Sequence, residues 1–223
     1  MDKVIKLAIV DDDDISKRII GIHLKNAKNI KIILEASNGK ELQDALALKK
    51  QKPDVILMDL EMPVMDGIET TEYLDKQYPD IKILILTVHD DEKISNHLIE
   101  KGANGFLTKH ADMNILVKAI TTVYESGYYF EGWDLKKIVN LKKIRNKVNS
   151  KSKVIFSKRE LEIIKLLLQG YTNKEISTKL NISTRTVEVH RDNVLKKTNS
   201  RNIAHFAVYA VQHGLIDFND EKK

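Results

Sequence analysis

Residues 55–67 read VILMDLEMPVMDG, and this stretch decides the fold of the first half of the chain. Its first four residues are apolar without a break, a pattern typical of a strand that is covered on both faces of a parallel sheet. Asp59 stands where that strand ends, and Asp66-Gly67 has the composition of a turn. The stretch therefore predicts a buried strand that delivers a carboxylate to its carboxyl end.

Further apolar runs lie before and after this strand in the chain, at Ile5–Val10, Lys31–Ala36, Ile81–Leu86 and Gly105–Leu107. Between them, apolar residues recur at helical spacing over segments of about 10–15 residues. One predicted buried face consists of Leu42, Ala45, Leu46 and Leu48. Five strands that alternate with helices predict an α/β domain with a doubly wound, five-stranded parallel sheet.

The composition changes after Gly127, and a length of 223 residues suits one or two domains. Residues 131–158 carry nine basic and two acidic residues. We therefore predict an α/β domain over residues 1–128, a basic and partly helical linker over residues 129–154, and a helical domain over residues 155–223.

The composition also excludes several classes of protein. The chain has no cysteine, which rules out disulfide scaffolds, cysteine-ligated zinc and thiol nucleophiles. No apolar run approaches the roughly 20 residues that a membrane span needs, and the acidic N-terminal segment does not resemble a signal peptide. We expect a cytoplasmic protein with no membrane partner.

The formal net charge of +5 is unevenly distributed. Residues 1–130 hold 17 Lys and Arg against 22 Asp and Glu, a balance of −5, whereas residues 131–223 hold 20 against 10, a balance of +10. A basic second half suggests a polyanionic partner such as nucleic acid. The same charge distribution would also arise from two ordinary solvated surfaces that differ in lysine content. The sequence motifs must therefore decide whether the second half binds nucleic acid.

Five polar residues follow the predicted strands at their carboxyl ends: Asp11, Asp12, Asp59, Thr87 and Lys109. Ligands of open parallel sheets bind at this edge, so we expect the five side chains to converge. Three carboxylates in one place repel one another unless a cation joins them, and Mg²⁺ prefers such oxygen ligands. One carboxylate can then attack a phosphoryl group and form an aspartyl phosphate. Lys109 would balance the transferred charge, and the Thr87 hydroxyl would donate a hydrogen bond to it.

The motifs VDD at 10–12, MDLEMPVMDG at 58–67, LT at 86–87 and GFLTK at 105–109 together resemble a response-regulator receiver domain. The resemblance implies a flavodoxin-like fold and phosphorylation by a histidine kinase. It also implies specific roles: Asp59 as phosphoacceptor, Asp11, Asp12, Asp59 and the Glu61 backbone carbonyl as Mg²⁺ ligands, and Thr87 and Phe106 as a coupled switch pair.

Two positions depart from the receiver pattern. His110 stands where many receivers carry proline, and Val88 stands where a smaller residue is usual. Neither touches the phosphoryl chemistry. As a hypothesis, Glu61 and His89 flank the phosphoryl group and tune the attack of water; the alternative is that both are exposed loop residues.

The chain is predicted to be helical from Ser157 onward. Ser157 and Glu160 form a capping-box signature, and the buried stripe of that helix is predicted to be Leu161, Ile164, Leu167 and Leu168. Thr172 is expected to cap a short second helix, and Ser183 or Thr184 a longer third one. A short helix, a tight turn and a longer helix are typical of the helix-turn-helix motif, whose second helix enters the major groove of DNA.

The stretches FSKRE at 156–160, GYTNKEIS at 170–177, ISTRTVEVHR at 182–191 and LKK at 195–197 resemble the LuxR-type DNA-binding domain. The whole chain therefore resembles a NarL/FixJ-type response regulator, which implies binding to double-stranded DNA and a homodimer when phosphorylated. The expected DNA contacts are Lys174, Thr184, Arg185, Thr186, Glu188, Val189, His190 and Arg191. Glu188 can accept a hydrogen bond from cytosine, and Asp192 is expected to face solvent.

Two rival functions remain open at this point. A metal-dependent phosphotransfer enzyme is disfavoured because the sequence offers no separate substrate motif, histidine cluster or phosphate loop. We therefore expect no enzyme beyond self-phosphorylation and self-dephosphorylation. An adaptor whose helix-turn-helix has lost DNA binding is kept open by the acidic Glu188 and Asp192.

Overall fold

The computed structural model describes residues 4–25, 27, 29–88, 92–130, 154–169 and 171–212. The chain divides into two compact units between Glu131 and Gly132. Residues 131–153 of the predicted linker, the C-terminal residues 213–223 and His89 lie outside the described residues. No helix in the described ranges is both long and apolar enough to cross a membrane.

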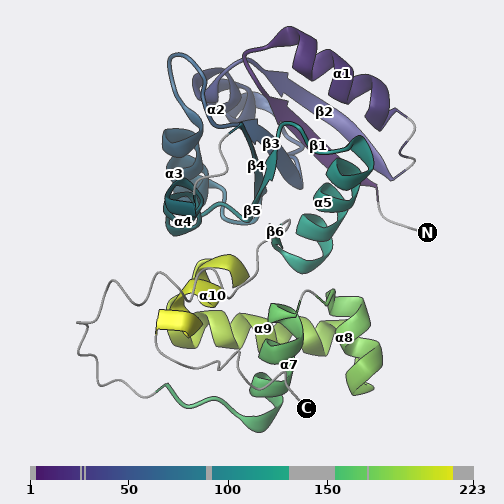
Figure 1. Ribbon diagram of the computed structural model, residues 1–223, viewed down its shortest axis with the longest axis vertical. Helices are drawn as coiled ribbons and strands as arrows, with labels where there is room; N and C mark the ends of the chain where they lie inside the picture. Colours follow the sequence, from purple (N-terminus) through teal and green to yellow (C-terminus); the bar gives the residue numbers. More distant parts are fainter. Residues whose placement is uncertain are drawn as a thin grey trace. The chain divides into compact units, whose positions relative to one another are not determined.

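The first unit is built on a parallel sheet with the strand order β2-β1-β3-β4-β5-β6 (Figure 1). Its strands are β1 (Ile5–Val10), β2 (Ile30–Ala36), β3 (Val55–Asp59), β4 (Lys82–Thr87), β5 (Gly105–Thr108) and β6 (Tyr129–Phe130). Its helices are α1 (Asp14–Leu24), α2 (Gly39–Leu48), α3 (Gly67–Gln77), α4 (Glu92–Lys101) and α5 (Met113–Ser126). Helices α1 and α5 cover one face of the sheet, and α2, α3 and α4 cover the other (Figure 1). The prediction of a doubly wound sheet with five parallel strands is confirmed.

The sixth strand is an addition at the edge of that sheet. Residues 129 and 130, which the sequence analysis assigned to the linker, pair in parallel with β5. Asn104 supports this edge, because its side-chain amide donates to the Gly127 carbonyl at 2.8 Å and its backbone carbonyl accepts from Tyr129 N–H at 3.0 Å. Two residues are too short to show the alternation by which a strand is recognised in a sequence.

One local prediction for the first unit is wrong. Leu48 was expected on the buried face of α2 but is 87% exposed, because it lies six residues after Leu42 and two after Leu46, and at 100° per residue neither spacing places it on the face of these buried leucines. The N-cap of α1 is Asp13, whose carboxylate accepts from Ile15 N–H at 2.9 Å. Asp14 lies in the first helical turn, where it pairs with Lys17.

The second unit consists of α7 (Lys158–Leu168), α8 (Asn173–Leu180), α9 (Thr184–Thr198) and α10 (Ile203–Gln212) (Figure 1). Capping boxes begin α7 at Ser157 and α8 at Thr172, and Ser183 caps α9. Helix α8 ends at Asn181 in a left-handed conformation with φ 51°, which turns the chain directly into α9. The predicted helix-turn-helix arrangement is therefore present.

The buried stripe of α7 differs from the prediction. Leu161 is 40% exposed, and the buried positions are Glu160, Ile163, Ile164 and Leu167. The physical reason is the carboxylate of Glu160, which accepts from Ser157 N–H at 2.7 Å and from the Lys197 ammonium of α9 at 2.7 Å. These bonds satisfy a charge that is otherwise costly to bury, so α7 turns Glu160 and not Leu161 toward α9.

The orientation of α7, with Ile163 buried and Leu161 exposed, can be tested by truncating one residue on each face. Ile163 is fully buried, so Ile163→Ala is expected to lower the free energy of unfolding by about 2–4 kcal/mol, because it leaves a cavity. Leu161→Ala is expected to cost less than about 1 kcal/mol. Urea unfolding of the full-length chain, followed by far-UV circular dichroism, measures both values. Equal losses for the two variants would contradict the assignment.

Candidate functional site

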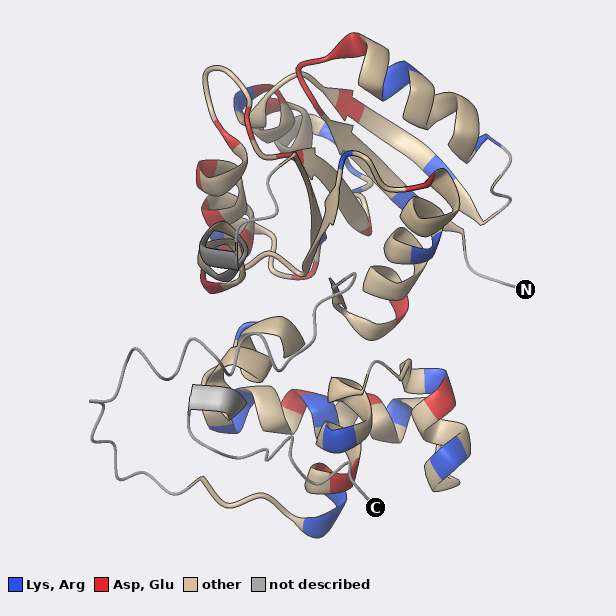
Figure 2. Cartoon of the chain, viewed as in Figure 1, with Lys and Arg blue, Asp and Glu red and all other residues tan. Residues whose placement is uncertain are grey.

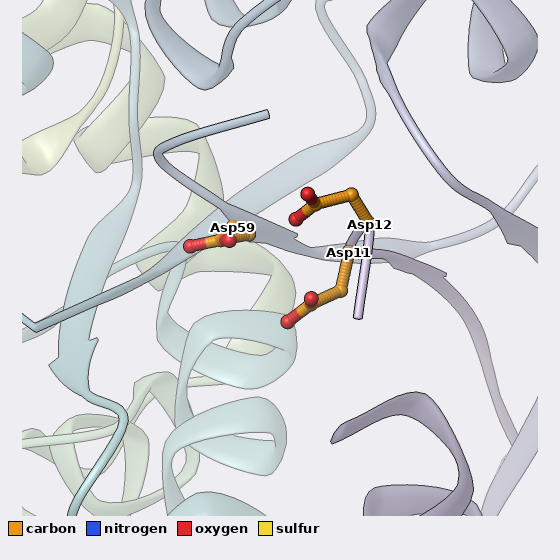
Figure 3. Close-up of side chains that lie close together, drawn as sticks. All are labelled: Asp11, Asp12 and Asp59. Atoms are coloured by element: carbon orange, nitrogen blue, oxygen red, sulfur yellow. The ribbon is translucent and has the colours of Figure 1, made fainter. Parts of the chain in front are cut away.

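Three carboxylates meet at the carboxyl edge of the sheet (Figure 3). Asp11 and Asp12 follow β1, and Asp59 is the last residue of the adjacent strand β3. One ligand oxygen from each lies within 4.8 Å of the other two. Asp11 and Asp59 are buried, whereas Asp12 is exposed and opens the cluster to solvent. The parallel topology thus brings together residues that are 48 positions apart in the chain.

Lys109 completes the cluster from the loop after β5. Its ammonium lies 2.8 Å from a carboxylate oxygen of Asp59 and 3.0 Å from one of Asp11. The Lys109 backbone N–H donates to the Thr87 carbonyl at 2.8 Å, which ties this loop to the end of β4. All five residues predicted to converge therefore lie along one edge of the sheet.

The cluster shifts the acidity of its members. Burial raises the pKa of the Asp59 carboxyl above its ordinary value, and the negative charge of Asp11 adds to this, against the opposing effect of Lys109. Burial by itself would lower the pKa of the Lys109 ammonium, but its hydrogen bonds to Asp59 and Asp11 outweigh burial and raise that pKa. The charged carboxylate of Asp59 is thus held in place at a cost in free energy, which a further cation would relieve.

The donor set fits a magnesium ion. Mg²⁺ binds through one or two carboxylates together with water and phosphate oxygens, and three carboxylates within reach of one another supply such ligands. Exposed Asp12 leaves an approach from solvent. Asp11, Asp12 and Asp59 are the residues that can hold the ion.

The loop after Asp59 is held in a tight, specific shape. Leu60 N–H donates to a carboxylate oxygen of Asp59 at 2.7 Å, and Gly67 N–H donates to the Leu60 carbonyl at 2.9 Å. A side chain at Gly67 would place its Cβ 2.6 Å from the Asp59 carbonyl oxygen, so only glycine fits there. The motif glycine therefore permits α3 to start directly against the end of β3.

Val64 forms the strained point of the same loop. Its φ of 70° and the 2.8 Å hydrogen bond from Met65 N–H to the Pro63 carbonyl describe a γ-turn, a conformation that is costly for a β-branched residue. Its side chain is 81% exposed. Sequence reasoning missed this feature because nothing in the pattern marks valine for a left-handed conformation. Glu61, in the same loop, is exposed.

The predicted switch residues occupy neighbouring strands. Thr87 is the last residue of β4 and is 3% exposed, and Phe106 lies in β5 and is 8% exposed. In the sheet register Thr87 is opposite Thr108, while Phe106 is opposite Ile85 of β4 and Phe130 of β6. Val88 and His110, the two departures from the receiver pattern, are exposed at the ends of these strands.

Helix α9 presents most of the predicted DNA contacts. Thr184 and Arg185 are exposed and Val189 is 45% exposed, and Lys174 is exposed on α8. Thr186, Glu188, His190 and Arg191 are partly exposed. Val187 and Val194 are fully buried and belong to the core. Asp192 is exposed, as predicted.

Acidic residues partly neutralise the basic residues of α9. Arg185 pairs with Glu188 and Arg191 pairs with Asp192, each at 3.3 Å between nitrogen and oxygen. Basic and acidic residues are interspersed along the helices of this unit (Figure 2). These residues were predicted as separate DNA contacts, although the spacing of three between Arg185 and Glu188 already indicates a pair on one helix face.

The raised pKa of Asp59 predicts a gain in stability when its charge is removed. The folded chain binds a proton on this carboxyl more tightly than the unfolded chain, so stability falls as the pH rises from 3.8 through the raised pKa. Asp59→Asn is expected to increase the free energy of unfolding at pH 7, without Mg²⁺, on the order of 1 kcal/mol. The gain should shrink as the pH is lowered toward 3.8.

Urea unfolding with EDTA over this pH range measures the effect, and Asp44→Asn on the exposed surface of α2 is the control. A loss of stability in Asp59→Asn at pH 7 would contradict the stated cost of the carboxylate.

Comparison with known proteins agrees with the two units. The sequence model of the response regulator receiver domain matches residues 7–121, and that of the luxR family of bacterial regulatory proteins matches residues 154–210. The oxygen regulatory protein NreC of Staphylococcus carnosus (strain TM300) is 33% identical over 219 residues, which cover 96% of this chain and 100% of NreC. The transcriptional regulatory protein DegU of Brevibacillus brevis is 30% identical over 228 residues and covers 95% of both chains.

Solved structures show the same architecture. The signal receiver domain of NarL from Mycobacterium tuberculosis is 26% identical, with a TM-score of 0.50 over 55% of this chain and 97% of that one. A structure of two RcsB dimers bound to two parallel DNAs is 20% identical, with a TM-score of 0.54 over 96% of this chain and 100% of that one, and shows the fold alone. From the two matched domains and relatives matched along their whole length, the chain belongs to the response regulators that join a receiver domain to a luxR-family DNA-binding domain.

Proposed function

We propose that this protein is a transcription regulator whose DNA binding is controlled by phosphorylation of Asp59. A histidine kinase is the phosphodonor, and Mg²⁺ is the required cofactor. The observation that carries the proposal is the contact of Lys109 with both Asp11 and Asp59 beside a third carboxylate, because one ammonium against three carboxylates leaves this cluster of described residues short of positive charge.

The arrangement supports attack by Asp59 on a phosphoryl group. A carboxylate oxygen of Asp59 forms a bond to phosphorus while the bond from phosphorus to the histidine nitrogen of the kinase breaks and that nitrogen keeps the electron pair. Lys109, 2.8 Å from Asp59, lies where it can neutralise a phosphoryl oxygen. Mg²⁺, bound by Asp11, Asp12, Asp59 and the backbone carbonyl of Glu61, supplies further positive charge when present. Catalysis here is positioning and electrostatics, which suits a domain that only modifies itself.

The switch is proposed to run from Thr87 to Phe106. The Thr87 hydroxyl at the end of β4 donates to the new phosphoryl group, and Phe106 on the adjacent strand repacks in response. Phosphorylation then stabilises an active conformation that already exists in the ensemble, which requires only a few kcal/mol of differential stabilisation. In this proposal the active form dimerises. The proposal includes the hypothesis that Glu61 and His89 flank the phosphoryl group and tune the attack of water on it.

Helix α9 is the proposed reader of DNA in the major groove. The residues proposed to contact phosphates and bases are exposed or partly exposed: Lys174 of α8, and Thr184, Arg185, Thr186, Glu188, Val189, His190 and Arg191 of α9. A homodimer would place two such helices on two half-sites. Because the proposed partner is DNA, we place this activity in the cytoplasm.

The adaptor alternative retains one observation in its favour. The pairs Arg185–Glu188 and Arg191–Asp192 reduce the positive charge that α9 offers to phosphate. A footprint of the phosphorylated protein on DNA from its own promoter region would support the regulator, and the lack of any salt-dependent DNA binding would support the adaptor.

Phosphorylation of Asp59 is tested with acetyl phosphate as donor. The wild-type chain should gain a phosphoryl group, detected by retarded migration in a phosphate-affinity gel. EDTA and Asp59→Asn should each abolish the gain, because they remove the cation and the nucleophile. Lys109→Ala should slow it by about tenfold or more, since one charged contact to the transferred group is lost. Asp44→Asn is the control. Labelling that persists in Asp59→Asn would refute Asp59 as the acceptor.

Phosphate contacts of the second unit are tested by the salt dependence of DNA binding. Lys174→Ala and Arg191→Ala should each weaken binding to promoter DNA and reduce the slope of log K against log salt by about 0.9, since each removes one phosphate contact. Filter binding at a series of NaCl concentrations measures the slope. Lys165→Ala, an exposed cation of α7, is the control and should leave the slope unchanged. An unchanged slope in both test variants would exclude them as phosphate contacts.

A further inference from the structure

The exposed face of α9 carries two carboxylates beside one arginine. Arg185, Glu188, Val189 and Asp192 follow one another at spacings of three, one and three residues, which places them on one side of the helix. Val187 and Val194 are fully buried on the opposite side. A surface that only attracts phosphate has no use for carboxylates there, so their presence needs a reason in recognition.

The pair formed by Arg185 and Glu188 is asymmetric. The Arg185 side chain is 84% exposed, whereas that of Glu188 is 37% exposed and lies closer to the helix. The guanidinium nitrogen is 3.3 Å from the carboxylate oxygen. Within the described part of the chain, Glu188 is the only ion-pair or hydrogen-bond partner of the Arg185 side chain. The long side chain of Arg185 on the exposed face is thus held by the shorter side chain of Glu188, three residues further along the helix.

We propose that Glu188 determines specificity by acting through Arg185. This inference rests on the proposed DNA binding by α9. A free arginine at this position reaches phosphate on any sequence, which strengthens binding without discrimination. Held by Glu188, the guanidinium stays over the helix face, where the edges of the bases lie when a helix occupies the major groove. Glu188 is therefore a positioning residue for Arg185.

The chemistry of the pair defines the DNA that it suits. Arginine donates two parallel hydrogen bonds to the O6 and N7 acceptors of guanine, and a glutamate accepts from the N4 amino group of cytosine. A base-pair step that presents the edge of a guanine beside the edge of a cytosine can form hydrogen bonds with both Arg185 and Glu188. Any other step leaves a desolvated carboxylate facing acceptors or phosphate, which is repulsive. Glu188 thus weakens binding to wrong sequences more than to the right one.

The second ion pair of α9 provides a matched control. Arg191 and Asp192 are adjacent in sequence and pair at 3.3 Å between nitrogen and oxygen. The Arg191 side chain is only 22% exposed. Asp192→Asn therefore removes the same charge from the same helix without releasing Arg185, and it measures the effect of losing a carboxylate that is paired with a different arginine.

The test uses the full-length chain phosphorylated with acetyl phosphate. A preferred duplex is first selected from random DNA with the wild-type protein, and dissociation constants are then measured for this duplex and for a scrambled one of equal length. The measure of specificity is the ratio of the dissociation constant for scrambled DNA to that for the preferred duplex. Glu188→Gln is expected to lower this ratio by about tenfold. It is also expected to steepen the slope of log K against log salt on scrambled DNA by about 0.9. Asp192→Asn should change both constants by the same factor and keep the ratio.

The dependence on Arg185 is tested by a double mutant. In an Arg185→Ala background, Glu188→Gln should change the ratio by a clearly smaller factor than in the wild-type background, because the cation that Glu188 positions is absent and only the direct contact of Glu188 with the base remains. The inference is overturned if Glu188→Gln shifts both constants equally, as Asp192→Asn does, or if its effect on the ratio is undiminished without Arg185. Those outcomes leave DNA binding intact. A wild-type chain that selects no sequence and shows no salt-dependent binding would overturn the proposed function itself, and this inference with it.

Discussion

The ammonium group of Lys109 holds the carboxylates of Asp11 and Asp59 together, and the functional edge of the sheet depends on this contact. For this contact to form, strands β1, β3 and β5 must end at the same edge of the sheet. A parallel sheet in which β1 lies beside β3 provides this arrangement. Two buried carboxylates beside each other are unstable without such a cation. One lysine nevertheless balances only part of the charge, so the resting site is built to accept more positive charge.

The convergence of this site was predictable because it follows from topology. Continuous apolar runs indicate strands buried on both faces, and polar residues at their ends must then share one edge. Features that depend on individual backbone angles were not predictable. The two-residue strand β6 has no periodicity to detect, and the γ-turn at Val64 places a β-branched residue in a conformation for which sequence rules give no signal.

The second unit shows a different reason for errors. The capping box of α7 and the cap of α8 at Thr172 were predicted from the sequence, because a fixed spacing of side chains defines such caps. The orientation of α7 was not, because the periodic pattern allows Leu161 or Glu160 to face the core, and apolarity favours leucine. Glu160 is buried instead because its carboxylate pairs with Lys197, which lies 37 residues further along the chain. A buried charge cannot be inferred until its counter-ion is known to lie across from it.

The distribution of charge separates attraction from discrimination in this chain. Residues 131–223 carry a balance of +10, of which +7 lies in residues 131–158, yet the exposed face of α9 combines Arg185 with two carboxylates. Attraction to phosphate does not depend on sequence, so cations anywhere along the second half can supply it. Discrimination requires groups that are penalised at the wrong base. A helix face with little net charge is therefore suited to selecting a site, while basic residues elsewhere bring the protein to DNA.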